Sequence, residues 1–229
     1  MLTLDGVEAA YGPSRVLHGI SLGAREGEVV SLLGRNGAGK STTLKAVMGL
    51  VDVTGGSIRL DGRELRGQAT HEIARLGVGW VPEDRRIFSD LSVEENLLVG
   101  GGNAGGRSVA RVYEHFPALG RMARRRGGSL SGGEQQMLTV ARTLMGSPRL
   151  LLLDEPSEGL APVIVQALGQ QIAALKREGL TIVLSEQNLK FAARLADRAY
   201  IIEKGQIRWD GPMARLMEDE AVRRAYLTV

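Results

Sequence analysis

The segment that most constrains the fold of this chain is Gly34–Ser41, which reads Gly-Arg-Asn-Gly-Ala-Gly-Lys-Ser. It fits the phosphate-loop pattern, in which glycines let the backbone wrap tightly and successive N–H groups point at phosphate oxygens. The apolar run Val29–Leu33 leads straight into the loop and predicts a buried strand, and Lys40 to Met48 predicts the helix that follows. This order indicates a nucleotide site, and a chance match in an ordinary glycine-rich turn is the alternative.

Two side chains at the end of this loop have distinct expected roles. Lys40 would reach the β- and γ-phosphates of the nucleotide, and the Ser41 hydroxyl would ligate Mg²⁺. The helix N-terminus adds partial positive charge at the same place.

A second chemical signal is the apolar run Leu150–Leu153, which ends in Asp154 and Glu155. A carboxylate at the end of a buried strand emerges at the carboxyl edge of the sheet, where ligands bind in open α/β folds. We expect Asp154 to hold Mg²⁺ through water and Glu155 to polarise the attacking water. The alternative is a strand that ends in a solvated acidic turn before Pro156.

A third signal is Ser131-Gly132-Gly133-Glu134, which precedes a periodic apolar helix. Serine followed three residues later by glutamate predicts a capping box, and this structural explanation is strong. A capped helix start also offers N–H groups to an anion, and the Ser131 hydroxyl can donate to a γ-phosphate oxygen. Capping does not need two glycines, which favours a phosphate contact in addition to the cap.

Composition limits the classes of protein that the chain can belong to. Its 229 residues suffice for one sizeable α/β domain or two small ones. The net charge of +3 and the 4% aromatic content do not indicate nucleic-acid binding. The chain has no cysteine, and no segment approaches the ~20 apolar residues of a membrane span. The first five residues lack the features of a secretory signal, so we expect at most a peripheral role at a membrane.

The order of predicted elements indicates a largely parallel sheet with helices on both faces. Strand patterns occupy Thr3–Leu22, Leu150–Leu153 and Thr181–Leu184, and hairpins are predicted at 57–62 and 200–208. Residues from about Ser89 to Ala141 instead show mostly helical patterning. We expect this stretch to form a helical subdomain inserted between the α/β parts.

The three signals, in this order, resemble the ATP-binding-cassette (ABC) ATPases, and the resemblance covers essentially the whole chain. It implies a P-loop NTPase fold in a single domain, 1–229, with an N-terminal antiparallel β subdomain. The RecA-like core would comprise about 1–88 and 146–229, and the helical subdomain about 89–145. It also implies a dimer in which Ser131–Gly133 of one chain cap the ATP held by the other.

The resemblance also implies most of the ATP-binding residues. Tyr11 falls where the family stacks an aromatic ring on adenine, and Val16 would line the same side. The alternative for Tyr11 is an ordinary strand or turn tyrosine. The loop residues implied to bind ATP are Arg35, Asn36, Gly37, Ala38, Gly39, Lys40, Ser41 and Thr42, and those of the cap are Ser131, Gly132 and Gly133.

Two residues depart from the usual ABC ATPase pattern and narrow the choice of subfamily. Most ABC ATPases have a glutamine between the lobes, and this chain has Glu83 in its place. Most also have a switch histidine after the next strand, and this chain has Gln187 in its place. Together with Ser-Gly-Gly-Glu-Gln-Gln-Met-Leu, these departures resemble the LivF-type subunits of branched-chain amino-acid importers. Glu83 would be a metal residue together with Ser41 and Asp154, and would bring charge near the γ-phosphate. Gln187 would take a catalytic place beside Glu155, although an amide can only hydrogen-bond and cannot become cationic.

The resemblance implies several partners. Membrane permease subunits would dock in the groove between the lobes near Glu83, and the second ATPase subunit would be identical or LivG-like. A periplasmic solute-binding protein would act indirectly, and the chain would lie on the cytoplasmic face of the membrane. The rival functions are a urea or amide importer, a lipid-exporter type, a soluble ABC ATPase and a scaffold that binds but does not hydrolyse ATP.

Overall fold

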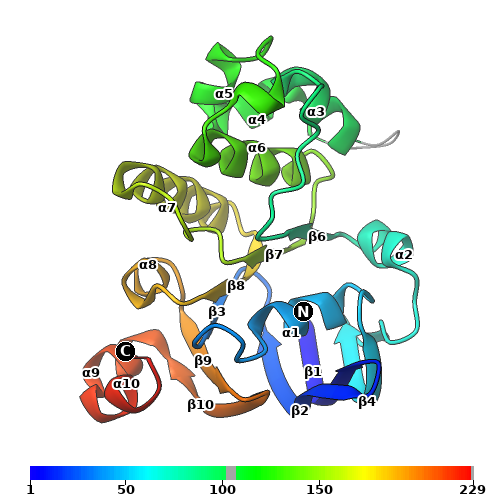
Figure 1. Ribbon diagram of the computed structural model, residues 1–229, viewed down its shortest axis with the longest axis vertical. Helices are drawn as coiled ribbons and strands as arrows, with labels where there is room; N and C mark the ends of the chain where they lie inside the picture. The colour runs from blue at the N-terminus through cyan, green and yellow to red at the C-terminus, as the bar shows by residue number, and fades with distance from the viewer. Residues whose placement is uncertain (102–106, 228–229) are drawn as a thin grey trace.

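The computed structural model describes residues 1–101 and 107–227, and within them the strands form two sheets (Figure 1). The larger sheet has the strand order β10-β9-β3-β8-β7-β6. Every neighbouring pair is parallel except β9 with β10, which confirms the predicted, mostly parallel core. The strands of this sheet are β3 (Val29–Leu33), β6 (Val78–Val81), β7 (Leu150–Asp154), β8 (Thr181–Glu186), β9 (Arg198–Glu203) and β10 (Gln206–Pro212).

The central strands of the larger sheet are buried on both faces, as their apolar runs require. Every residue of β3, β7 and β8 is buried. Because side chains alternate along a strand, Leu151 and Leu153 join one hydrophobic core, and Leu150 and Leu152 join another. The sheet therefore separates two cores.

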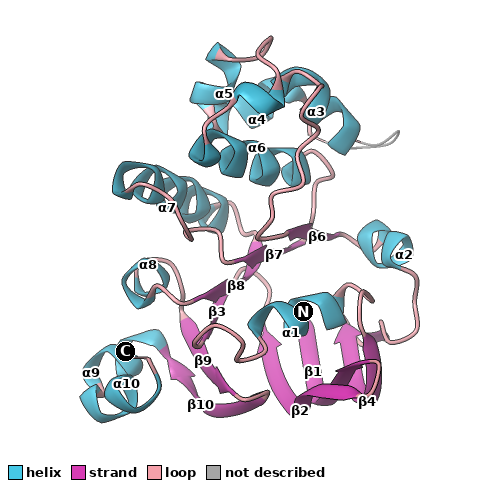
Figure 2. Ribbon diagram, in the orientation of Figure 1, coloured by secondary structure: helices cyan, strands magenta, loops and turns pink. Residues whose placement is uncertain are grey.

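The two faces of the larger sheet are covered differently (Figure 2). Helices α7 (Pro162–Arg177) and α8 (Leu189–Ala193) contribute apolar residues to the first core. The second core lies under α1 (Lys40–Val47) and an antiparallel sheet of strand order β2-β1-β4-β5, which confirms the expected N-terminal β subdomain. The strands of this sheet are β1 (Leu2–Tyr11), β2 (Ser14–Ala24), β4 (Asp52–Leu60) and β5 (Arg63–Glu64).

The helices of segment 89–145 gather at one end of the molecule, away from the antiparallel sheet (Figure 1). Its described residues form α3 (Val93–Gly100), α4 (Val109–His115), α5 (Pro117–Arg121), the 3₁₀-helix η1 (Gly127–Ser129) and α6 (Gly132–Leu144). Capping boxes begin α3 at Ser92 and α6 at Ser131. Residues 102–106 lie outside the described part of the chain. We propose the division into a core of about 1–88 and 146–229 and a helical subdomain of about 89–145.

The remaining helices lie on the core part of the chain. They are α2 (Thr70–Arg75), α9 (Met213–Glu218) and α10 (Glu220–Tyr226). None of the helices in residues 1–101 and 107–227 combines the length and the apolar character needed to cross a membrane.

The predicted element boundaries are close to those observed, with one informative exception. β3 has the predicted bounds, α1 ends one residue early at Val47, and both predicted hairpins form. β8 instead continues two residues beyond the predicted end at Leu184, through Ser185 and Glu186. These two polar residues stay buried because hydrogen bonds within the molecule satisfy them.

The turn between β9 and β10 connects the two sheets to the phosphate loop. The Gly205 N–H donates to the Ala38 carbonyl at 2.8 Å, and the Gly205 carbonyl accepts the His18 N–H at 2.8 Å. Gly205 has a φ of +71°, and a Cβ there would overlap the Val16 carbonyl oxygen. Only glycine fits, because both the dihedral angle and the space exclude a side chain.

We expect Gly205→Ala to destabilise the protein by about 3 kcal/mol or more, because the added methyl group must displace the β2 backbone and also strains φ. Gly179→Ala is the matched control, since Gly179 has a φ of +87° but a Cβ there meets nothing within 4 Å. The control should cost about 1 kcal/mol. Urea unfolding of both variants measures the difference, and equal losses would contradict the role of the β2 contact.

Candidate active site

The phosphate loop connects β3 to α1 and depends on glycine at three positions. Gly37 and Gly39 have φ of +75° and +113°, which glycine adopts at little cost. A Cβ on Gly34 would overlap the Ile202 carbonyl oxygen, so β9 passes too close for a side chain. The loop therefore lies at the carboxyl end of β3, against the end of β9.

The Lys40 side chain is buried and folds back over the loop that precedes it. Its Nζ donates to the carbonyl oxygens of Gly34 at 2.8 Å and Arg35 at 3.0 Å. The same nitrogen forms an ion pair with Glu155 Oε1 at 3.0 Å, with side chains only 2% and 8% exposed. The structure thus brings together the lysine predicted to bind phosphate and the glutamate predicted to polarise water.

Asp154 lies beside the Ser41 hydroxyl, as expected of two ligands of one Mg²⁺ ion. Asp154 Oδ1 accepts hydrogen bonds from Ser41 Oγ at 2.9 Å and from Ser185 Oγ at 2.7 Å. Burial raises the pKa of the Asp154 carboxyl, and the two hydrogen bonds oppose this rise. Hydroxyl and carboxylate oxygens are hard ligands, and Mg²⁺ is usually bound by one or two carboxylates together with substrate phosphates. The donors present here fit that ion.

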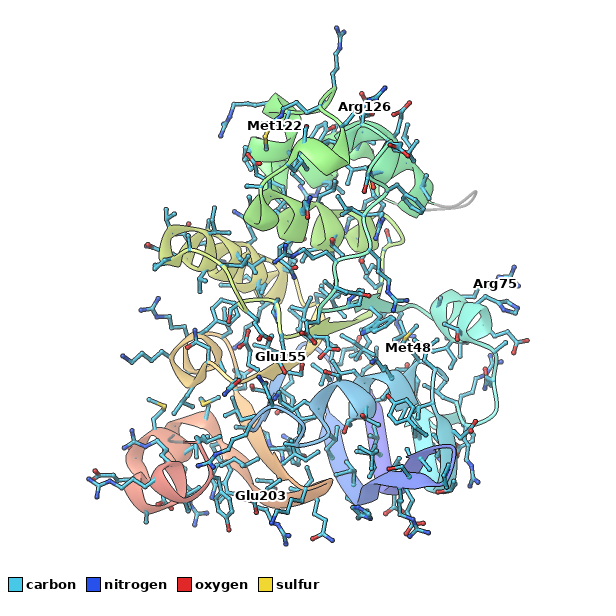
Figure 3. The ribbon with its side chains drawn as sticks, in the orientation of Figure 1. Met48, Arg75, Met122, Arg126, Glu155 and Glu203 are labelled. Atoms are coloured by element: carbon cyan, nitrogen blue, oxygen red, sulfur yellow. The ribbon has the colours of Figure 1, made fainter. Side chains whose placement is uncertain are left out.

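Glu155 is held in an unusual backbone conformation at the end of β7. Its φ is +44°, which is uncommon for a residue other than glycine. Its N–H donates to both the carbonyl and the Oγ of Ser185, each at 3.1 Å. Figure 3 shows Glu155 near the centre of the molecule. Residues held in sparsely populated conformations cluster at functional sites, so this feature marks Glu155 independently of the motif.

Glu186, which sequence reasoning missed, directly follows Ser185 at the end of β8. It is 2% exposed, and its Oε1 accepts the Ser157 N–H at 3.0 Å while its Oε2 accepts the Asn188 N–H at 3.1 Å. Burial raises the pKa of the Glu186 carboxyl, and hydrogen bonds from Ser157 and Asn188 oppose the rise. The signal in the sequence was a Ser-Glu pair that continues an apolar run with no turn residue before it.

Gln187 and Glu83, the two departures from the family pattern, are both exposed. Gln187 follows β8 at the edge where Asp154 pairs with Ser185, so it lies at the expected end of the sheet. Glu83 lines a cavity of about 240 Å³ together with Asp154 and Lys45. The structure therefore places Glu83 near the predicted metal ligands.

The Ser131–Gly133 segment begins α6 with the predicted capping box. The Ser131 Oγ accepts the Glu134 N–H at 3.4 Å, and the Ser131 N–H donates to Glu134 Oε2 at 2.7 Å. Gly133 also has a packing reason that sequence reasoning did not foresee, because a Cβ there would lie 2.7 Å from Ile164 Cγ2. A Cβ on Gly132 would instead meet the end of the flexible Arg85 side chain, which can move away. Gly133 is therefore weaker evidence for a phosphate contact than the sequence indicated.

The residues predicted to hold adenine lie on the strands next to the loop. Tyr11 ends β1 and is 45% exposed, and Val16 lies on β2. The Val16 carbonyl is in contact with Gly205, whose N–H binds the phosphate loop at Ala38. Of the predicted loop residues, Arg35, Asn36 and Gly37 are exposed, and Ala38, Gly39, Lys40 and Thr42 are buried.

Comparison with known proteins matches this geometry to a family. Residues 17–158 match the family described as ABC transporter. The chain belongs to the ABC transporter family. It is 47% identical to the high-affinity branched-chain amino acid transport ATP-binding protein BraG of Pseudomonas aeruginosa, over 99% of each chain. It is 33% identical to the lipopolysaccharide export system ATP-binding protein LptB of Escherichia coli, covering 99% of this chain and 96% of LptB.

Solved structures of the ABC transporter family have the same fold. A structure described as the ATP-binding subunit of an ABC transporter has a TM-score of 0.83 and 29% identity, covering 99% of this chain and 96% of that chain. The dimeric structure of MJ0796, a bacterial ABC transporter cassette, has a TM-score of 0.81 and 26% identity, covering 93% of this chain and 99% of the MJ0796 chain. This chain is thus an ABC ATPase subunit, a class that dimerises and works with membrane components of a transporter.

Glu158 gives the site of this ABC ATPase a measurable pH dependence. A hydrogen bond with Glu155, followed by burial and the charges of Glu155 and Glu83, raises the pKa of Glu158 to about 7. An unfolded glutamate has a pKa of about 4.3, so the folded protein binds this proton more tightly. The stabilising contribution is fully present below about pH 4 and is lost as the pH rises through about 7.

We therefore expect Glu158→Gln to flatten the decrease in Tm between about pH 4.5 and about pH 7, because the neutral amide cannot lose a proton. Differential scanning calorimetry across this range measures the slope. Glu26→Gln, which changes an exposed glutamate of the β2–β3 turn, is the control and should leave the slope as in the wild type. A Glu158→Gln slope identical to that of the control would show that Glu158 does not titrate in this window.

Proposed function

We propose that this chain is the ATP-hydrolysing subunit of an importer for branched-chain or related amino acids. The observation that carries the proposal is the Lys40–Glu155 ion pair beside the Ser41–Asp154 hydrogen bond. These two contacts bring the candidate phosphate-binding residue Lys40, the candidate metal ligands Ser41 and Asp154 and the candidate base Glu155 together at one edge of the sheet. The similarity to BraG over 99% of both chains supports the solute class, because the name of BraG gives it branched-chain amino acid transport.

ATP is bound by the loop at the carboxyl end of β3. The N–H groups of residues 35–42 surround the phosphates, and Lys40 supplies the main side-chain charge. Tyr11 stacks on adenine and Val16 lines the same side. The exposed ring of Tyr11 and the contact of the Val16 carbonyl with the Gly205 turn support this placement.

Mg²⁺ would be held by Ser41, Asp154 and Glu83. The ion would share the negative charge of the phosphates during transfer. The fit rests on the hydroxyl and carboxylate oxygens of Ser41 and Asp154, which already share a hydrogen bond, and on the cavity that Glu83 and Asp154 both line.

Glu155 polarises the attacking water, and its ion pair with Lys40 regulates when it can do so. Phosphates that compete for the Lys40 cation weaken the pair and leave the Glu155 carboxylate free to accept a hydrogen bond from water. Gln187 donates one hydrogen bond toward the γ-phosphate and accepts one from water, without a titratable switch. Catalysis is then mainly positioning and charge stabilisation, as in phosphoryl transfer generally.

The working unit is a head-to-tail dimer, in which Ser131–Gly133 of one subunit cap the ATP held by Gly37–Thr42 of the other. Within one chain, α6 belongs to the helical part and packs into the first core, whereas α1 packs into the second. The dimeric structure of the MJ0796 cassette supports a dimer as the working unit. The second subunit is either an identical chain or a LivG-like one.

The membrane permease subunits dock in the groove between the helical and core parts, near Glu83. A cavity of about 420 Å³ is lined from both parts, by Trp80 on one side and Val99 on the other, and Trp80 also lines the neighbouring cavity of Glu83. Phe88 and Val99 are 46% and 56% exposed, which suits an apolar docking surface. The subunit thus sits on the cytoplasmic face of the membrane, and a periplasmic solute-binding protein acts only through the permease.

A lipopolysaccharide-type exporter subunit is the second candidate, because LptB is similar over nearly the full length of both chains. The import function is favoured because identity to BraG is 47% against 33% for LptB.

We expect Glu155→Gln to keep ATP affinity and to slow ATP hydrolysis by roughly 10²–10⁴-fold, the range for loss of a positioned base. With ATP it should accumulate as a dimer in size-exclusion chromatography, because binding without turnover keeps the nucleotide between the subunits. In proteoliposomes that contain the permease subunits, the wild type should drive leucine uptake and Glu155→Gln should not.

Lys40→Ala is the companion variant, and it should lose ATP affinity in calorimetric titration where Glu155→Gln does not. Wild-type turnover in Glu155→Gln would overturn the hydrolytic role of Glu155. ATP-driven transport of lipopolysaccharide instead of leucine would establish the exporter function and exclude the importer.

A further inference from the structure

The end of β8 holds a buried carboxylate that the proposed hydrolysis step does not use. Glu186 is the last residue of a strand that is buried at every position, and it pairs with Leu33 of β3 at the start of the phosphate loop. The hydrogen bonds that the structure gives its two oxygens come from backbone N–H groups. A buried carboxylate without a cation is costly unless N–H groups satisfy it. The hydrogen bonds of Glu186 therefore offset the cost of burying its carboxylate, and the positions of the N–H donors indicate what this side chain does.

The two oxygens of Glu186 bind two different loops. Oε1 accepts the N–H of Ser157, the first residue of the Ser157–Leu160 loop that follows Glu155 and Pro156. Oε2 accepts the N–H of Asn188, which directly follows Gln187 and whose Oδ1 caps α8 by accepting the Phe191 N–H. One side chain thus fixes the backbone on both sides of the candidate site.

Only a carboxylate can make this connection. Both partners are N–H donors, so the side chain between them must offer two acceptor oxygens. A glutamine in the same place would turn its amide N–H₂ toward one of the two N–H groups, and a donor facing a donor cannot hydrogen-bond. The acidic residue is therefore specified by the pair of loops that it joins.

The neighbouring residue, Ser185, fixes the other groups of the site. Its Oγ donates to Asp154 and, together with its carbonyl, accepts the Glu155 N–H. Asp154 and Glu155 are thus held directly by β8. The Ser157–Leu160 loop and Gln187 are linked to each other through Glu186.

We propose that Glu186 is a positioning residue that couples the Ser157–Leu160 loop to Gln187. The inference rests on the proposed function, in which a second subunit packs against the first. A shift of the Ser157–Leu160 loop on contact with that subunit moves the Ser157 N–H, and the Glu186 carboxylate transmits the shift to the Asn188 N–H and hence to Gln187. Hydrolysis then responds to dimer formation and not to ATP binding alone.

The first test is Glu186→Gln in the full-length protein. We expect a folded variant that binds ATP within about twofold of the wild type, because Glu186 contacts neither Lys40 nor Ser41, and a turnover number lower by about tenfold or more. Glu203→Gln is the matched control: Glu203 ends the neighbouring strand β9, but it is partly exposed and its carboxylate forms an ion pair with Arg208 on the adjacent strand β10. The control should keep wild-type turnover.

A double-mutant cycle separates coupling from a general structural effect. Gly159→Ala strains the Ser157–Leu160 loop, because Gly159 has a φ of +66° and a Cβ there meets nothing within 4 Å. With Glu186 present, the effects of Gly159→Ala and Gln187→Ala on turnover should be non-additive by about threefold or more. With Glu186→Gln they should become additive. A merely structural Glu186 would lower turnover without changing the interaction term.

Each outcome decides the inference. Unchanged turnover in Glu186→Gln, or the same interaction term with glutamate and glutamine at 186, overturns the coupling while the proposed function stands. A wild-type protein that does not hydrolyse ATP overturns the proposed function itself. If Glu186→Gln fails to fold, Glu186→Asp retains both acceptors on a shorter side chain, and the same cycle in that variant should show a reduced but measurable interaction term.

Discussion

The arrangement of the site depends on one buried positive charge, the ammonium group of Lys40. Removing a cation from water costs several kcal/mol unless an anion and further acceptors surround it. Lys40 has all of these in the carbonyl oxygens of Gly34 and Arg35 and the carboxylate of Glu155. Because the acceptors come from the loop after β3 and from the end of β7, a single nitrogen fixes two distant parts of the chain against each other.

The parallel order of the strands explains why these parts meet. Leu33 pairs with Glu186, and Asp154 pairs with Ser185, so the ends of β3, β7 and β8 share one edge. The sequence predicts this much, since glycine after Leu33 and carboxylates after Leu153 mark the ends of apolar runs that need burial on both faces. The end of a strand is easiest to predict from the sequence where an apolar run is followed directly by a glycine or a charged residue.

The parts that sequence reasoning missed depend on contacts between distant residues. The end of β8 was misplaced because Ser185 and Glu186 are polar, and only the partners Asp154, Ser157 and Asn188 make their burial favourable. The packing role of Gly133 could not be predicted for the same reason, because its neighbour Ile164 lies far along the chain. The roles of individual residues in ATP binding and hydrolysis remain predictions.

Acidic groups crowd the edge of the sheet at which nucleotide binding is proposed. Five carboxylates gather there, namely Glu83, Asp154, Glu155, Glu158 and Glu186. Burial raises the pKa of Asp154 and Glu186, and the hydrogen bond with Glu155, followed by burial, raises the pKa of Glu158. In the proposed function, Lys40 and the start of α1 supply positive charge next to the phosphates. The proposed Mg²⁺ ion would add positive charge where these carboxylates and the phosphates of ATP would otherwise repel one another.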